Sequence, residues 1–276
     1  MLNVMMIDEQ ARSRFLEDGY LVVPDVVPRD LCQNVVDAIA VFTGIDPHDP
    51  QTWYDPRFTG LGIVPLHHHE ALWAVRQHPD VYEVFRRLHG RDELWVSMDR
   101  VGYKPPASPE TTEWTRSPFH WDCDPWTFDG FSLQGIVYLT DTTEDQGAFC
   151  CVPSIYRHLN DYRREHANDE TRRQPVFLEK DVVSVPGTAG SLVIFHRLMP
   201  HTNGINRAAK PRYAQYVTMD VAGGEDERLA RVHDWQTRMP PAWAVKQKIS
   251  WQQVPEPGDP APLTELGKKL VGVTPW

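Results

Sequence analysis

The first third of the chain combines helical hydrophobic periods with one short apolar run. Apolar residues three and four positions apart place one face of each predicted helix toward a core. Glycines follow two of these segments, and glycine favours helix ends because it readily adopts the left-handed backbone. The predicted helices span 7–19, 28–44 and two pieces within 70–89, and the predicted strand spans 20–27. We therefore expect a mainly helical part over about residues 1–90.

From Glu93 onward the period changes from helical to alternating. Short segments rich in β-branched and aromatic residues are bounded by Gly, Pro or Asp, which is the pattern of strands joined by turns. The predicted strands lie at 93–104, 131–141, 147–153, 181–186, 191–196 and 212–221, with a helix at about 154–168 among them. This arrangement predicts an antiparallel sandwich or barrel over about residues 91–222.

Residues 223–276 form a tail with a different pattern. One helix is predicted at 225–236, and a proline-rich stretch punctuated by tryptophans follows it. A chain of 276 residues is long enough for one large domain or two small ones. We expect the tail to wrap the strand-rich part, so that residues 1–276 form a single domain that is mainly β with flanking helices.

Composition narrows the class of protein. The formal net charge is −10, from 28 basic and 38 acidic residues, which argues against nucleic acid or an anionic membrane as the main partner. The four cysteines lack the spacing of a disulfide framework, so we expect reduced thiols and a cytoplasmic protein. The N-terminus lacks a signal-peptide pattern, and no stretch approaches the roughly 18 apolar residues of a membrane span.

Candidate metal chemistry begins at His120 and Asp122. Residues two apart on a strand point to the same face, so this imidazole and this carboxylate would lie side by side. They would supply two of the three ligands of a facial triad for non-haem iron. A lone His-x-Asp pair is usually an ordinary polar strand end, so a third ligand is needed. His196 and His201 are both candidates for it.

An arginine helps to choose between these histidines. In iron enzymes of this type the far carboxylate of 2-oxoglutarate needs a cation, and arginine grips a carboxylate through two parallel hydrogen bonds. Arg207 follows His196, and Arg212 follows His201, each by eleven residues. Arg207 lies in a turn-like segment, whereas Arg212 opens an alternating strand. We therefore predict His201 as the third ligand and Arg212 as the carboxylate clamp.

Several segments, taken in this order, resemble the phytanoyl-CoA dioxygenase family of iron(II)/2-oxoglutarate oxygenases. The resemblance runs from about Phe15 to Val221. It includes the opening FLEDGYLVVPDVV, the pair HWD, the strand and glycine turn of LQGIVYLTDTTEDQGAFCCVPSIYRH, and the closing GSLVIFHRLMPHTNGINRAAKPR. The resemblance implies a double-stranded β-helix, or cupin-like jelly roll, with helices packed on one sheet.

The resemblance also implies an activity and roles for single residues. The expected site residues are His120, Asp122 and His201 for Fe(II), Arg212 for the 5-carboxylate of 2-oxoglutarate, and Asn203, Gln134 and Trp126 for further co-substrate contacts. The implied enzyme is a dioxygenase that consumes O₂ and 2-oxoglutarate and hydroxylates a small-molecule substrate. Halogenating relatives carry a small residue at the position of Asp122, so the carboxylate there favours hydroxylation.

Two other classes of function stay open. A cupin-like metalloenzyme that does not use 2-oxoglutarate would make Arg212 dispensable, and a catalytically silent small-molecule-binding protein would bind no metal. Other segments also have two interpretations. HHH at 67–69 is either a polar approach to a helix or a metal site, and the Pro-, Ser- and Thr-rich segment 104–118 is predicted to be an active-site lid. Arg100, Tyr103, Lys104 and Arg197 are either solvated or line the substrate pocket.

Overall fold

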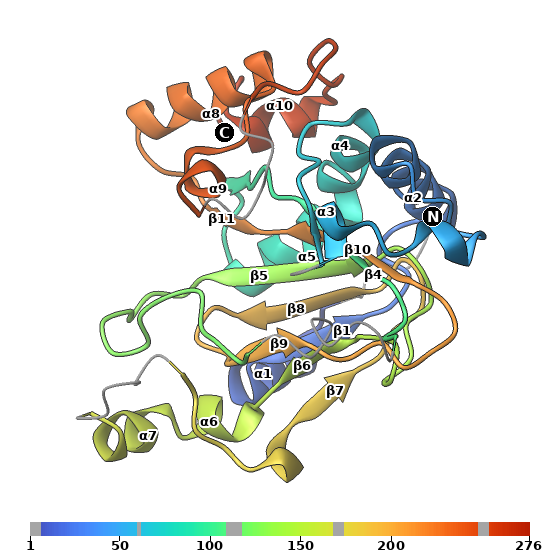
Figure 1. The fold of residues 1–276 in the computed structure, drawn as a ribbon. Coiled ribbons are helices and arrows are strands. Elements are labelled where there is room, and N and C mark those ends of the chain that lie inside the picture. The colour runs from blue at the N-terminus through green and yellow to red at the C-terminus, as the bar shows by residue number, and fades with distance from the viewer. Residues whose placement is uncertain (1–6, 60–61, 109–117, 168–173, 248–253) are drawn as a thin grey trace.

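The computed structural model describes residues 7–59, 62–108, 118–167, 174–247 and 254–276. Figure 1 shows a large antiparallel sheet in the middle of the molecule, with helices α2, α4, α8 and α10 above it and a smaller sheet of β6, β7 and β9 below it. The prediction of a mainly β chain with flanking helices is therefore confirmed.

The helices expected in the N-terminal part form close to their predicted positions. They are α1 (Glu9–Asp18), α2 (Arg29–Thr43), α4 (Glu70–Arg76) and α5 (Pro79–His89), and the unpredicted short elements η1 (Pro50–Thr52) and α3 (Pro56–Thr59) lie between them. Gly19 ends α1 with φ of 78°, the left-handed conformation that favours glycine, and its N–H donates to the carbonyl of Phe15. At the other end, the side chain of Asp8 accepts a hydrogen bond from the N–H of Ala11 and caps the helix.

The large sheet has the strand order β1-β8-β5-β10-β4-β2, with every neighbouring pair antiparallel. Its strands are β1 (Tyr20–Val23), β8 (Leu192–His196), β5 (Leu133–Tyr138), β10 (Arg212–Val217), β4 (Val101–Lys104) and β2 (Ile63–Val64). The side chains of β5 alternate between two cores: Leu133 and Val137 pack against the helices, whereas Ile136 and Tyr138 face the smaller sheet. The space between the two sheets is therefore lined by the second set, and this space holds the site described below.

The smaller sheet has the order β7-β6-β9, formed by β7 (Val183–Val185), β6 (Phe149–Cys151) and β9 (His201–Asn203). Strand β9 was not predicted, because three residues give too short a run for an alternating pattern. Two predicted strands were wrong in extent. The runs 93–104 and 212–221 are each divided, because β3 (Leu94–Val96) and β11 (Met219–Val221) leave the large sheet and pair with each other.

The C-terminal segment contains two helices that the sequence pattern did not predict. Besides α8 (Glu225–Thr237), it forms α9 (Ala242–Gln247) and α10 (Glu265–Val271). The predicted helix at 154–168 is also divided, into α6 (Pro153–Arg157) and α7 (Leu159–Glu165). At the end of the chain the ring of Trp276 stacks on Tyr82 with centroids 5.5 Å apart, so the last residues pack on the N-terminal helical layer. None of the helices in the described residues combines the length and the apolar character needed to cross a membrane.

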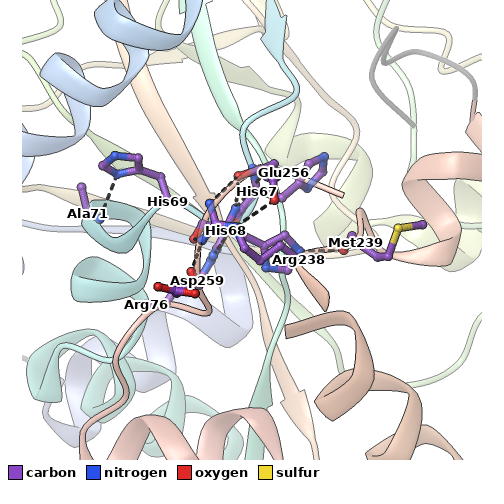
Figure 2. A network of polar contacts seen from close by, with 9 residues as sticks. All are labelled: His67, His68, His69, Ala71, Arg76, Arg238, Met239, Glu256 and Asp259. Atoms are coloured by element: carbon purple, nitrogen blue, oxygen red, sulfur yellow. Dashed lines mark hydrogen bonds and ion pairs between the residues drawn. The ribbon is translucent and has the colours of Figure 1, made fainter. Parts of the chain in front are cut away.

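A buried polar network ties this C-terminal segment to the helical layer, as Figure 2 shows. The carboxylate of Glu256, only 4% exposed, accepts hydrogen bonds from the backbone N–H groups of His67 and His68 and lies 3.5 Å from the guanidinium of Arg238. The imidazoles of His67 and His68 are fully buried and bond to the carbonyls of Met98 and Met239. In the part of the chain that the structure describes, residues 67–69 belong to no group of three metal donors.

The two buried histidines predict a loss of stability in acid. Burial lowers the pKa of His67 and of His68 to about 3, so both are neutral when folded and take up protons on unfolding below about pH 6.5. Because the unfolded state then binds more protons, the free energy of unfolding should fall as pH falls from about 6.5 toward 3, by up to about 2.7 kcal/mol per pH unit for two protons. Urea unfolding between pH 7 and 5 measures this slope.

A matched pair of variants tests whether the buried histidines cause this pH dependence of the free energy of unfolding. In His68→Gln the free energy of unfolding should depend less steeply on pH, by the amount that corresponds to about one proton. This should hold whatever the effect of the substitution on stability at pH 7. His233→Gln, which changes an exposed histidine of α8, should leave the pH dependence unchanged. Equal slopes for wild type and His68→Gln would contradict the assignment.

Candidate metal centre

Three potential ligands from distant parts of the chain meet between the two sheets. His120 and His201 form an isolated antiparallel bridge, in which each backbone N–H donates to the other's carbonyl at 3.1 and 3.0 Å. Asp122 lies between their rings: its Oδ1 is 3.5 Å from His120 Nε2 and its Oδ2 is 3.7 Å from His201 Nε2. All three ligand atoms lie within 4.8 Å of one another.

The hydrogen bonds of both imidazoles leave the correct nitrogen available to a metal. His120 Nδ1 lies 3.1 Å from the carbonyl of Pro118, and His201 Nδ1 lies 3.0 Å from the carbonyl of Met199. A carbonyl can only accept, so in the neutral rings the proton is on Nδ1 and the lone pair is on Nε2, facing Asp122.

The electrostatics favour the ligand form of two of these groups. Burial alone would raise the pKa of Asp122, but His120, His201 and the amide of Gln134 together hold it well below its usual range. Burial lowers the pKa of His201 to about 4. Burial also opposes the charged form of His120, yet the hydrogen bond and charge of Asp122 raise the pKa of His120. At neutral pH the site therefore offers an ionised carboxylate and a neutral buried imidazole, both able to bind a cation.

A cavity of about 400 Å³ adjoins the three ligands and extends between the sheets. Its apolar wall is formed by residues such as Ile136, Phe149 and Phe195, and the rings of both phenylalanines lie beside His201. Gln134 and Asn203, both expected at the co-substrate, lie on its polar wall. The Oδ1 atom of Asn203 is buried without a hydrogen-bond partner among the described residues, so it is free to accept one from a ligand.

Arg212 lies on the same inner face of the large sheet, beyond the residues that line this cavity. Its side chain is buried, its Nε and Nη2 have no hydrogen-bond partner among the described residues, and its guanidinium lies 5.4 Å from the ring of Tyr138. Lys104 is its cross-strand partner, also buried, and burial together with the charge of Arg212 lowers the pKa of Lys104 to about 8. Neither cation has an ion-pair partner within the described part of the chain. Two buried cations without a carboxylate make an anionic ligand the expected partner.

The comparison with family models agrees with this set of residues. A model of the phytanoyl-CoA dioxygenase family (PhyH) matches residues 15–214, well over half of the chain. The chain belongs to the phytanoyl-CoA dioxygenase family. Family membership and the His-Asp-His donors together support an oxygenase of the Fe(II)/2-oxoglutarate-dependent kind, with Fe(II), 2-oxoglutarate and O₂ as cofactors.

Relatives of this phytanoyl-CoA dioxygenase family member are distant in sequence. A Dictyostelium discoideum protein named as a phytanoyl-CoA dioxygenase is 23% identical, over 72% of this chain and 71% of its own. Among solved structures, the GlcNAc Inducible Gene 2 product of Candida albicans is 14% identical with a TM-score of 0.74, covering 97% of this chain and 76% of its own. EvdO2 from Micromonospora carbonacea, complexed with 2-oxoglutarate, is 19% identical with a TM-score of 0.56, covering 82% of this chain and 97% of its own. These likenesses show a shared fold.

Gln134 contacts one of the three candidate ligands, Asp122, which the sequence did not predict. From β5 its amide Nε2 donates to Asp122 Oδ2 at 2.6 Å, while its Oε1 is buried without a partner among the described residues. The hydrogen bond holds the carboxylate beside the two histidines. No local pattern could have revealed this contact, because the two residues lie on different segments and meet only after the sheets have formed.

Removing this hydrogen bond should loosen the metal site. We expect Gln134→Leu to weaken metal binding by about 10- to 100-fold, the range typical of lost contacts to metal ligands. Equilibrium dialysis with Fe(II) under anaerobic conditions measures it. Gln33→Leu, the same change at an exposed amide of α2, is the control and should have no effect. An unchanged affinity in Gln134→Leu would show that Asp122 is held without it.

Two other residues lie away from the cavity. Trp126, expected near the co-substrate, instead packs against Trp121 and Tyr162, and its indole N–H donates to the carbonyl of Arg163 at 3.2 Å. It lines neither this cavity nor a second cavity that adjoins it. His196, the alternative third ligand, is buried between the rings of Phe131 and Tyr156, each at 5.4 Å, and the structure brings His201 to the metal pair in its place.

The predicted lid, 104–118, falls largely on residues 109–117, which lie outside the described part of the chain. Its first residue, Lys104, belongs to β4 and faces the inside of the sandwich rather than the surface.

Proposed function

We propose that the protein is a non-haem Fe(II)/2-oxoglutarate-dependent dioxygenase that hydroxylates an unactivated C–H bond of a small molecule. We further propose that the two sheets form a double-stranded β-helix and that residues 1–276 make up one oxygenase domain. The observation that carries the proposal is the placement of two groups on one inner surface. Three metal donors lie at one position, and Arg212, a buried arginine without a carboxylate partner in the described chain, lies farther along the same face.

In this proposal the protein binds the metal ion and 2-oxoglutarate through different residues. His120, Asp122 and His201 hold Fe(II), which when bound supplies the redox chemistry with O₂. Arg212, with Lys104 beside it, binds the far carboxylate of 2-oxoglutarate, and the co-substrate contact expected of Asn203 suits its buried, unpaired oxygen. The overall reaction balances as substrate, 2-oxoglutarate and O₂ giving alcohol, succinate and CO₂. The apolar wall beside His201 would limit the access of water on that side of the reacting centre.

The structural neighbour EvdO2, solved with 2-oxoglutarate bound, supports this choice of co-substrate. The carboxylate at position 122 supports hydroxylation in particular, since it occupies the ligand position that a halogenating site leaves to chloride.

An anaerobic titration tests the proposal. Fe(II) and 2-oxoglutarate added together to the full chain should produce a weak visible charge-transfer band, and neither should produce it alone. A small-molecule panel scored by succinate release then searches for the substrate. Iron binding without the band would favour a cupin-like metalloenzyme that does not use 2-oxoglutarate, and the absence of iron binding would favour a silent binding protein.

A further inference from the structure

A second cavity opens directly from the metal site toward the C-terminal helices. Its volume is about 530 Å³, and it shares Asp122, Gln134 and Arg100 with the first, so the two are continuous. Its outer wall comes from β11, α8 and α9, with Asp220 and Trp243 among the lining residues. The family match ends at residue 214, so this wall lies in a part of the chain outside the matched region. The cavity is therefore the place where this chain can differ from its relatives in what it binds.

The inner wall continues the strand positions that surround the metal. Gln134 on β5 pairs in register with Phe195 on β8, and both face the metal cavity. Ser132 lies two residues before Gln134, and Arg197 lies two residues after Phe195. Both line the second cavity, and the N–H of Arg197 donates to the carbonyl of Ser132 at 3.0 Å. Ser132 and Arg197 thus lie next to the metal site, on the side opposite to Arg212.

Three polar atoms in this wall have no partner among the described residues. They are Arg197 Nε, Ser132 Oγ and Gln134 Oε1, and all three are buried. Arg197 also forms no ion pair with a described carboxylate, and its guanidinium lies 5.9 Å from the ring of Phe128. Buried polar groups are nearly always hydrogen-bonded in folded proteins, so these atoms indicate a missing ligand.

The other arginines of the same cavity already have protein partners. Arg231 donates to the carbonyls of Val96 and Leu270 and stacks on a tryptophan ring. Arg100 lies 3.5 Å from the carboxylate of Asp99 and 4.9 Å from the ring of Trp243. The Nε atoms of Arg100 and Arg231 are also without a hydrogen-bond partner among the described residues. Arg197 differs from both because its guanidinium has neither a carboxylate nor a carbonyl partner in the described part of the chain.

Charges in the cavity also fix the orientation of a ligand. The wall near α8 carries the carboxylates of Asp220, Glu227 and Asp234, which would repel an anion. The opposite side, close to the metal, also carries Asp99 and Asp122, whose charges Arg100 and a bound metal ion would offset. An anionic group is therefore favoured there, beside Arg197. A single guanidinium fork matches a carboxylate, which has one charge and two oxygens, better than a doubly charged phosphate.

We propose that this second cavity binds the oxidisable substrate, and that the substrate is a small carboxylic acid. Its carboxylate lies between Arg197 and Ser132, its oxidised carbon lies beside Gln134 near the metal, and its remaining part extends toward Trp243 and α8. The inference rests on the proposed function for the identity of the reaction, but the binding it predicts is measurable without turnover.

The test compares carboxylic acids with their neutral amides by calorimetry. The full chain is loaded with Mn(II) and saturated with N-oxalylglycine, an unreactive analogue of 2-oxoglutarate, so that Arg212 is occupied. The pairs are hexanoate and hexanamide, phenylacetate and phenylacetamide, and N-acetyl-leucine and its amide. At least one acid should bind about tenfold more tightly than its amide. Arg197→Gln should abolish this preference and Arg197→Lys should restore part of it.

Two controls separate this site from the rest of the protein. Arg29→Gln, which changes an exposed arginine paired with Asp141, should keep the preference for the acid. In the second control the acids and amides are titrated into Arg212→Gln without metal or N-oxalylglycine, so that no acid can bind at position 212. The preference for the acid over its amide should persist in this variant.

The proposal is overturned if no acid binds better than its amide, or if the preference survives in Arg197→Gln. Either result can be told apart from failure of the proposed function. Arg197→Gln should retain the Fe(II)/2-oxoglutarate band of wild type, so an intact band without acid preference rejects only the substrate class, and a missing band in wild type rejects the oxygenase assignment.

Discussion

His201→Ala should lose Fe(II) affinity by at least about a hundredfold, whereas His196→Ala should keep most of it. Residues that only support metal ligands typically contribute 10- to 100-fold, so loss of a ligand itself should equal or exceed that range. His120→Ala and Asp122→Ala should behave like His201→Ala, because the three donor atoms lie within 4.8 Å of one another. Anaerobic equilibrium dialysis measures the affinity.

His196→Ala serves as the matched control for this series. Both histidines are buried, at 5% and 8% exposure, and both lie at the end of a strand, His196 as the last residue of β8 and His201 as the first of β9. A general effect of losing a buried imidazole would therefore appear in both variants. Thermal unfolding of each variant shows whether it remains folded. If His196→Ala lost iron and His201→Ala retained it, the third ligand would be His196, and Arg207 would take the role proposed for Arg212.

Arg212→Ala should weaken 2-oxoglutarate binding by at least a hundredfold at saturating iron. Removing one partner of a buried charged pair costs on the order of 3–5 kcal/mol, because the other charge is left in a dry environment. Arg212→Lys restores the charge without the planar fork, so it should recover only part of the affinity. Iron binding should survive in both variants, since the metal donors are unchanged. The titration of the charge-transfer band with 2-oxoglutarate gives the apparent affinity.

The neighbouring cation makes this test sharper. Lys104 lies opposite Arg212 and remains in Arg212→Ala, so the double variant Arg212→Ala/Lys104→Met should bind more weakly still. Arg207→Ala is the control and should bind normally, because Arg207 is exposed and only its backbone N–H makes a hydrogen bond within the described part of the chain. A loss below about threefold in Arg212→Ala is too small for a broken buried charge pair. It would remove 2-oxoglutarate from this position and favour a cupin-like metalloenzyme.

The sequence by itself determined those features that depend on a few neighbouring residues. The helix ends at Gly19 and Gly44 follow from the left-handed backbone that glycine adopts, and both are present. The alternation of β10 placed Arg212 on the inner face, because successive side chains of a strand point in opposite directions. The expected adjacency of His120 and Asp122 is present, with their side chains 3.5 Å apart, but the strand predicted to produce it was wrong: His120 forms only an isolated bridge and Asp122 lies in a bend.

Only the tertiary structure decided which distant segments meet. The bridge between His120 and His201, the hydrogen bond from Gln134 to Asp122, and the packing of Trp126 away from the cavity all depend on the register of strands separated by long loops. The same holds for the C-terminal segment, where Glu256 binds backbone groups nearly 190 residues earlier. Such contacts have no local signature, because an isolated residue carries no information on the partner that long-range packing brings to it.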